Sequence, residues 1–160
     1  MKKVNYTIRA NYGYNPEHKG APYFVEDRFF NFGNLCECAV NEWVGQGFGY
    51  DTKAVPFDKG SDIESINASV KSSGASLACL YGTSKEDIID EYFNRVHSTE
   101  WIYVVEIDGE FNFYMMDANE FRAFLNEWAT MARESDGIRF KVRFKKTSGK
   151  MIAWMDERVA

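Results

Sequence analysis

The sequence has few of the residues that hold small or secreted proteins together. Only three cysteines, Cys36, Cys38 and Cys79, occur among its 160 residues. An odd number cannot all pair within the chain, which argues against a disulfide framework. Cys36 and Cys38 are one residue apart and only two histidines are present, so we expect no structural zinc site with four spaced ligands. Reduced thiols in a core are typical of a cytoplasmic protein, and this is the location that we expect.

Long hydrophobic runs are also absent from the sequence. No apolar stretch approaches the roughly 20 residues that cross a bilayer, and Met1–Tyr6 lacks the apolar segment of a signal peptide. We therefore expect no membrane partner. Hydrophobic residues make up 45% of the chain and charged residues 27%, as in ordinary globular proteins. A chain of 160 residues suits one domain, which we expect to span residues 1–160.

Negative charge exceeds positive charge in the chain as a whole, with 24 acids against 19 lysines and arginines, but one stretch near the end is strongly basic. The net charge is −5, yet residues 139–150 carry lysines and arginines and no acid. Binding to a polyanion depends on the local distribution of charge more than on the net value. The residues that we expect to contact nucleic acid are Arg139, Lys141, Arg143 and Lys145. Charges on a strand face also serve solubility and edge protection, and this simpler role is the alternative.

Hydrophobic periodicity predicts a chain in which strands and helices alternate. Extended or alternating segments predict strands at residues 4–10, 62–73, 75–81, 101–107, 111–116 and 138–144. Helical spacing predicts helices at residues 34–44, 84–96, 117–133 and 148–159. Glycines and prolines indicate a long loop at residues 11–31 and loops around a short strand at residues 45–60. This order is typical of an α/β sheet covered by helices.

The aromatic content is high, at 16%. Packing in the core is the simpler interpretation, and the alternative is that some rings stack on nucleic-acid bases. The rings to which this alternative applies are Tyr50, Trp101 and Trp154.

One stretch, residues 60–78, combines acids, serines and a lysine in a pattern that favours chemistry. If Val70 faces the core, Ser69 and Lys71 project to the opposite face of the strand, where they can reach a common site. Asp62 can lie beside them across a hairpin. Carboxylate oxygens bind Mg²⁺, and a lysine can orient or deprotonate the attacking water and offset developing charge. Hydrolysis of a phosphodiester needs such a set of groups.

Together with an acid on the preceding helix, these residues resemble the PD-(D/E)xK nuclease superfamily, which includes restriction endonucleases and Holliday-junction resolvases. The family pattern is an acid on a core helix, an aspartate after a glycine-rich loop, and acid-x-lysine on the next strand. Glu37, Asp62 and Lys71 take those places. The resemblance implies a restriction-endonuclease-like αβββαβ core sheet flanked by helices over about residues 33–107.

Two parts of the chain lie outside this resemblance. Residues 1–32 add an N-terminal strand and loop. Residues 108–160 add the second strand of a hairpin, a helix and the basic strand.

The sequence departs from the family pattern at one position. Ser69 stands where the family has Asp or Glu, two residues before Lys71. Some members with serine at this place recruit an acid from the following helix, and Glu86 is closest to the expected offset. Other acids that remain open for this role are Asp87, Asp90, Glu91 and, if the strand is bulged, Glu64.

The resemblance implies an endonuclease that uses Mg²⁺ or Mn²⁺ to hydrolyse phosphodiester bonds in DNA. The implied catalytic residues are Asp62, Lys71, Glu37 and Ser69. The implied metal ligands are Asp62, Glu37 and Glu86. Nucleases of this fold often pair so as to cut both strands, so a homodimer is open.

Two alternatives remain beside the nuclease. The first is a nuclease-fold module that has lost catalysis and binds nucleic acid or a protein, and Ser69 motivates it. The second is an accessory protein of a phage or mobile element that binds a host protein through its acidic surface.

Overall fold

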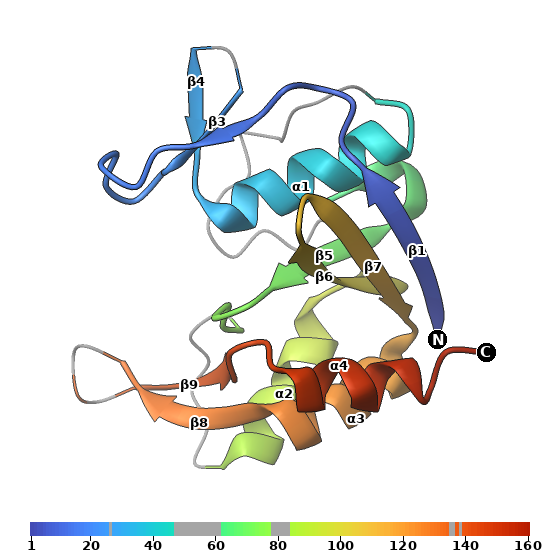
Figure 1. Cartoon of the computed structure of the whole chain (residues 1–160). Helices are drawn as coiled ribbons and strands as arrows, with labels where there is room; N and C mark the ends of the chain where they lie inside the picture. Colours follow the sequence, from blue (N-terminus) through green and yellow to red (C-terminus); the bar gives the residue numbers. More distant parts are fainter. Residues whose placement is uncertain (26, 47–61, 78–83, 135–136, 138) are drawn as a thin grey trace.

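The computed structural model of the chain describes residues 1–25, 27–46, 62–77, 84–134, 137 and 139–160 (Figure 1). A mixed sheet of four strands lies at its centre. In spatial order the strands are β1 (Lys2–Thr7), β7 (Glu110–Met116), β6 (Glu100–Ile107) and β5 (Ala68–Ser72). β7 pairs antiparallel with both β1 and β6, whereas β5 pairs parallel with β6. The prediction of an α/β fold is therefore confirmed.

Helices cover both faces of this sheet, and each face has its own core. α1 (Phe32–Trp43) packs on one face, through residues that include Leu35 and Val40. The helices on the other face are α2 (Lys85–Arg95), α3 (Ala118–Trp128) and α4 (Gly149–Asp156) (Figure 1). Rings dominate this second core, and Trp101 stacks on Phe121 with 5.4 Å between the ring centroids. Among the described residues, no helix has the length and apolar character needed to cross a membrane.

β6 and β7 form the hairpin that Asp108 and Gly109 predict. Both turn residues have positive φ, 50° at Asp108 and 84° at Gly109. A two-residue turn of this kind needs the left-handed backbone at both positions, and it matches the twist of the strands. The Gly109 N–H also donates to the Glu106 carboxylate at 2.7 Å.

Residues 11–31, predicted as a loop, contain a small sheet of three strands. β2 (Gly13–Tyr14), β3 (Tyr23–Val25) and β4 (Arg28–Phe30) pair antiparallel in that order. A Cβ added at Gly13 would lie 2.5 Å from Cζ of Phe24, so a glycine is needed where that ring crosses the strand. The loop prediction was wrong because strands of two and three residues are too short to show an alternating pattern.

The later part of the chain adds an antiparallel ribbon of two strands, β8 (Ala129–Arg133) and β9 (Phe140–Phe144). The helix predicted to reach residue 133 ends at Trp128, so that prediction was wrong for the last turn. The last carbonyl groups of a helix lack helical partners. The Lys85 ammonium group supplies a partner here, because it donates to the carbonyl oxygens of Asn126 and Ala129.

The finer prediction of an αβββαβ core stays a prediction. Between α1 and α2 the described residues hold one strand, β5, and a short 3₁₀ turn at Glu64–Ile66. The predicted elements at residues 45–60, and the end of the strand predicted at residues 75–81, lie outside the described residues.

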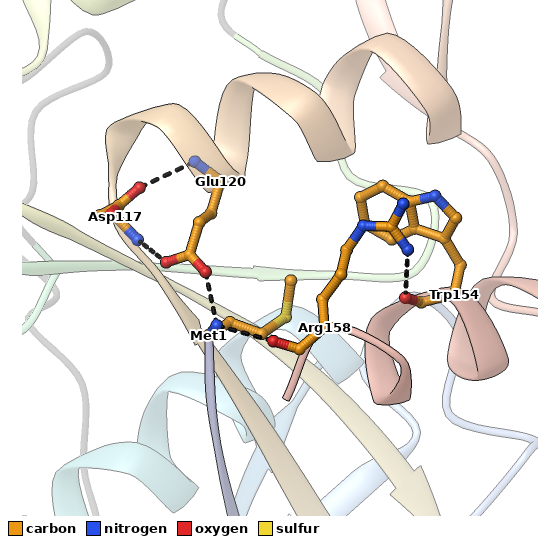
Figure 2. A network of polar contacts seen from close by, with 5 residues as sticks. All are labelled: Met1, Asp117, Glu120, Trp154 and Arg158. Atoms are coloured by element: carbon orange, nitrogen blue, oxygen red, sulfur yellow. Dashed lines mark hydrogen bonds and ion pairs between the residues drawn. The ribbon is translucent and has the colours of Figure 1, made fainter. Parts of the chain in front are cut away.

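The two ends of the chain are joined beside α3, as Figure 2 shows. The Met1 ammonium group pairs with Glu120 Oε2 at 2.5 Å and donates to the carbonyl oxygen of Arg158 at 2.9 Å. Glu120 also completes a capping box with Asp117 at the start of α3. The Arg158 guanidinium stacks on Trp154, 3.7 Å from its ring centroid. β1 is thereby fastened to α3 and to the residues that follow α4.

Candidate active site

β5 presents its residues alternately to the two cores, as the sequence predicts. Ala68 and Val70 belong to the core under α1. Ser69 and Lys71 lie on the other face, since their partners in the parallel register, Trp101 and Tyr103, belong to the core under α2 and α3. The prediction that Val70 faces a core while Ser69 and Lys71 share the opposite face is therefore confirmed.

Asp62 lies along the free edge of β5. Its Oδ2 accepts a hydrogen bond from the backbone N–H of Val70 at 2.8 Å. The next residue, Ile63, exchanges two backbone hydrogen bonds with Ala68. The N–H groups of Ala68 and Val70 point the same way, away from β6, because backbone direction repeats every second residue along a strand. The Asp62 carboxylate therefore stands at the open side of the sheet, level with the residue that precedes Lys71.

Lys71 is half-buried instead of extending alone into solvent. Its Nζ lies 5.9 Å from the ring centroid of Tyr92, a buried residue of α2. A cation held against an aromatic face is attracted by the ring, which restricts the lysine to one side of the strand. Lys71 thus lies next to α2, on the face of β5 that it shares with Ser69.

Ser69, two residues before Lys71 on β5, is buried. Its hydroxyl lies 2.6 Å from the Ser98 hydroxyl, and only 5% of Ser69 is exposed. The two neutral hydroxyls can hydrogen-bond to each other, so neither polar group is left without a partner in the interior. Ser69 therefore has a structural role: it is buried and hydrogen-bonds to Ser98.

The other predicted acids come from different elements. Glu37 lies on α1, and α1 covers the face of the sheet opposite to the one on which Lys71 lies. Glu86 is exposed in the first turn of α2. Within the described residues, no group of three or more His, Cys, Asp or Glu side chains is placed to hold a metal ion.

Among the described carboxylates, that of Asp62, beside the edge of β5, has the chemistry to bind a divalent cation. Mg²⁺ is usually held by one or two carboxylates, and water and substrate phosphate complete its shell. Asp62 has the hard oxygen donors for this role and stands on the open side of β5. Glu37 and Glu86 remain predictions as further ligands.

The buried thiols take no part in this chemistry. Cys36 and Cys38 are free and fully buried on α1, whereas Cys79 lies outside the described residues. Burial raises the pKa of the Cys38 thiol to about 12 and raises that of Cys36 further. Both thiols therefore stay protonated and unreactive at neutral pH.

The basic strand β9 lies directly beside residues 73–77, the segment that follows Lys71 (the Lys71 segment). The Leu77 N–H donates to the Val142 carbonyl at 2.9 Å, and the Phe144 N–H donates to the Ala75 carbonyl at 2.8 Å. Just after β9, the Thr147 N–H donates to Ser73 Oγ at 3.0 Å. Pairing of residues 75–77 with β9 could not be read from the sequence, because the two segments are far apart in the chain and alternation does not choose a partner.

The cations of β9 differ in their surroundings. Val142 and Phe144 are buried, while Arg143 and Lys145 are exposed, which confirms the predicted alternation. Lys141 pairs with Glu134 at 3.7 Å. Lys145 Nζ lies 5.8 Å from the Trp128 ring centroid. The predicted nucleic-acid contacts thus gather on the strand that adjoins the Lys71 segment.

The rings that were open as base-stacking residues are used in packing. Trp101 is 2% exposed and donates from Nε1 to the Tyr92 hydroxyl at 2.9 Å. Trp154 packs at the border of the core and under the Arg158 guanidinium. Tyr50 lies outside the described residues. The simpler interpretation, core packing, holds for both described rings.

Comparisons of the chain with protein-family models, with curated proteins and with solved structures found no match.

Proposed function

We propose that this chain is a metal-dependent endonuclease that hydrolyses phosphodiester bonds in DNA, with Asp62 and Lys71 at its catalytic centre. The observation that carries the proposal is the hydrogen bond from the Val70 N–H to Asp62 Oδ2, 2.8 Å long. It holds a carboxylate at the strand edge, level with the residue before Lys71, whose ammonium group lies over the Tyr92 ring. An acid and a lysine held at one strand are two of the groups that the reaction needs.

Each residue has a distinct task in this proposal. A divalent cation, Mg²⁺ or Mn²⁺, bound by Asp62 would polarise the phosphate and make its bound water more acidic. Lys71 orients the attacking water and offsets the negative charge that develops on the phosphate oxygens. The water supplies hydroxide to phosphorus and a proton to the departing oxygen, and the hydrogen bond to Val70 keeps the Asp62 carboxylate in place.

The position of β9 supports DNA as the substrate. Arg143 and Lys145 are exposed on the strand whose backbone is bonded to Ala75 and Leu77, a few residues beyond Lys71. Cations there can hold the phosphates on either side of the bond that is cut, and the local charge outweighs the net charge of −5 for this purpose.

A second candidate function is a nuclease-fold module that binds DNA without cutting it. The observation that favours it is the neutral, buried pair formed by Ser69 and Ser98 where the family has an acid. With fewer acids the metal would bind more weakly. Both candidates share the basic strand and differ only in cleavage.

Cleavage of supercoiled and linear DNA with Mg²⁺ or Mn²⁺, or with chelator, tests the proposal. The informative variants are Asp62→Asn, which keeps an oxygen for the Val70 N–H while removing the charge, and Lys71→Met, which keeps a side chain to pack on Tyr92. Each is expected to lose about 100-fold or more in rate. Glu110→Gln and Lys150→Met change exposed residues elsewhere and serve as matched controls.

The two candidates give different results. Metal-dependent cleavage that both variants lose supports the endonuclease. Folded wild-type protein that binds DNA without cutting it, with a melting temperature that neither metal raises, contradicts the endonuclease and supports the binding module.

A further inference from the structure

The ribbon formed by β8 and β9 has one face in the core, and its other face is exposed at Thr130 and Arg143 and half-buried elsewhere. Ala129, Val142 and Phe144 are buried on the inner face. Cross-strand pairing places Thr130 opposite Arg143 and Ala132 opposite Lys141. The pairing continues to Glu134 and Arg139, since the Glu134 N–H donates to the Arg139 carbonyl at 2.8 Å. We call the set of Thr130, Ala132, Glu134, Arg139, Lys141 and Arg143 the outer face of the ribbon.

The two strands contribute very different side chains to this outer face. β9 supplies cations at successive outward positions, whereas β8 supplies the small residues Thr130 and Ala132. Small neighbours leave room above the ribbon, so the cations are not covered by the facing strand. The outer face therefore carries three cations and one acid on a narrow, open support.

The shape of the ribbon selects among polyanions. The major groove of B-form DNA, about 12 Å wide, admits a two-stranded β ribbon. The major groove of an A-form RNA helix is too deep and narrow for side chains to read. Figure 1 shows β8 and β9 extending together away from the helices. A projecting ribbon of this kind can enter a groove without the rest of the molecule colliding with the duplex.

Arg143 is the outer cation best placed to contact a base. It is exposed and lies across from Thr130, and its side chain makes no hydrogen bond or ion pair with any residue that the structure describes. Lys141 is engaged by Glu134, and Lys145 lies over Trp128 and donates to the Glu127 carbonyl at 3.4 Å. A guanidinium with its donors available can bind O6 and N7 of guanine in bidentate fashion, which is the commonest specific contact in the major groove.

We propose that the outer face of the β8–β9 ribbon enters the major groove of double-stranded DNA and that Arg143 contacts base edges there. The inference rests on the proposed function, because it names how the substrate of that site is held and which form of DNA it is. Lys141 and Lys145, in this arrangement, lie beside the groove and neutralise phosphates.

Binding measured without metal tests the proposal separately from cleavage. The protein, with Asp62→Asn so that no DNA is cut, is titrated against labelled duplex DNA of roughly 20 base pairs, about two helical turns. The matched probes are one strand of that duplex alone and a duplex RNA of the same length. Duplex DNA is expected to bind at least several-fold more tightly than either. Equal affinity for all three probes would show attraction to phosphate charge alone and overturn the proposal.

Selection from duplexes of random sequence tests the role of Arg143. The Asp62→Asn protein is expected to enrich a motif that contains guanine, and Arg143→Ala is expected to lose the motif and roughly ten-fold or more in affinity for it. Arg143→Lys keeps the charge and is expected to retain affinity for unselected DNA while losing the motif. Lys141→Ala is expected to weaken all duplexes alike and to reduce the salt dependence by about one ion.

Lys19→Ala, an exposed cation in the loop between β2 and β3, serves as the control and is expected to change nothing. A motif that survives Arg143→Ala would overturn the assignment of Arg143. Duplex binding through the ribbon with no cleavage by wild-type protein would contradict the endonuclease and leave this inference standing. Cleavage by the wild-type enzyme that the ribbon substitutions leave unchanged would support the endonuclease and contradict this inference.

Discussion

The Tyr6 hydroxyl on β1 donates a hydrogen bond to the Glu42 carboxylate on α1 at 2.7 Å. The same carboxylate accepts hydrogen bonds from the backbone N–H groups of Arg9 at 2.5 Å and Ala10 at 3.2 Å. Glu42 is only 5% exposed, so these donors replace the water that a carboxylate would otherwise bind. One buried charge therefore joins the chain after β1 to the last turn of α1.

Glu42→Gln is expected to lower the free energy of unfolding by about 2–3 kcal/mol. The amide has one acceptor oxygen in place of two and turns its own donors toward the N–H groups, so hydrogen bonds to a charged group are lost. Urea denaturation at neutral pH measures the change. Glu110→Gln, an exposed change on β7, is the control. Equal stability of the two variants would contradict the stabilising role of the Glu42 carboxylate.

The same residue predicts acid sensitivity. Burial raises the pKa of Glu42, but the hydrogen bonds from Tyr6, Arg9 and Ala10 outweigh it and hold the pKa below the ordinary value of 4.5. A lowered pKa in the folded state means that the carboxylate contributes stability in full above that ordinary value. The contribution is lost as pH falls through the folded pKa. The stability gap between wild type and Glu42→Gln should therefore narrow in acid, and a constant gap from neutral pH to about pH 3 would rule this out.

Glu120→Ala is expected to destabilise the protein by about 1 kcal/mol. The change removes the Met1 ion pair and half of the capping box with Asp117, both drawn in Figure 2. Glu120→Gln keeps an acceptor for the Asp117 N–H and should recover part of the loss. Glu127→Ala, at an exposed position of the same helix, is the matched control, and thermal denaturation in low salt compares the three.

Gly13→Ala is expected to destabilise the small sheet by about 1–3 kcal/mol. Its Cβ would lie 2.5 Å from Cζ of Phe24, so the ring must leave its place over the strand. Gly149→Ala, where an added Cβ meets nothing within 4 Å, is the control and should be neutral or stabilising at the start of α4. Matching effects at the two glycines would argue against close packing of Phe24.

Ser69→Asp is expected to cost stability without increasing cleavage. It introduces the acid that the proposed nuclease relationship expects there, but the side chain would enter the buried space that the Ser98 hydroxyl now shares. A charge placed there without water costs about 2 kcal/mol or more. Denaturation and cleavage assays on the same preparations decide the matter, and a folded, faster enzyme would refute this reading of the site.

The parts of the fold that could be predicted are those with a local cause. Asp108 and Gly109 specify a tight turn by their backbone preference alone, and Ser84 accepts the Asp87 N–H at the start of α2 as its residue type predicts. The end of α3 has no such cause. Nothing in Ala129–Arg133 opposes a helix, and the segment becomes a strand because β9 is available as a partner.

In the candidate site, too, only the features with a local cause could be predicted from the sequence. That Asp62 lies beside β5 follows from the short connection between them, and the structure confirms it. That Glu37 and Lys71 approach from opposite faces depends on which side of the sheet each helix packs, which spacing along one chain does not specify. The proximity of β9 to the Lys71 segment depends likewise on pairing between distant residues.

The concentration of cations in residues 139–150, in a chain whose net charge is −5, also bears on how fast the proposed complex with DNA would form. In the proposed complex, DNA phosphates would attract β9 and repel the acidic surface, so the protein would approach the duplex with the ribbon first. Such steering acts on the rate of encounter more than on the lifetime of the complex, and dissolved salt weakens it by screening. Orientation would then be settled in solution, ahead of any contact with a base.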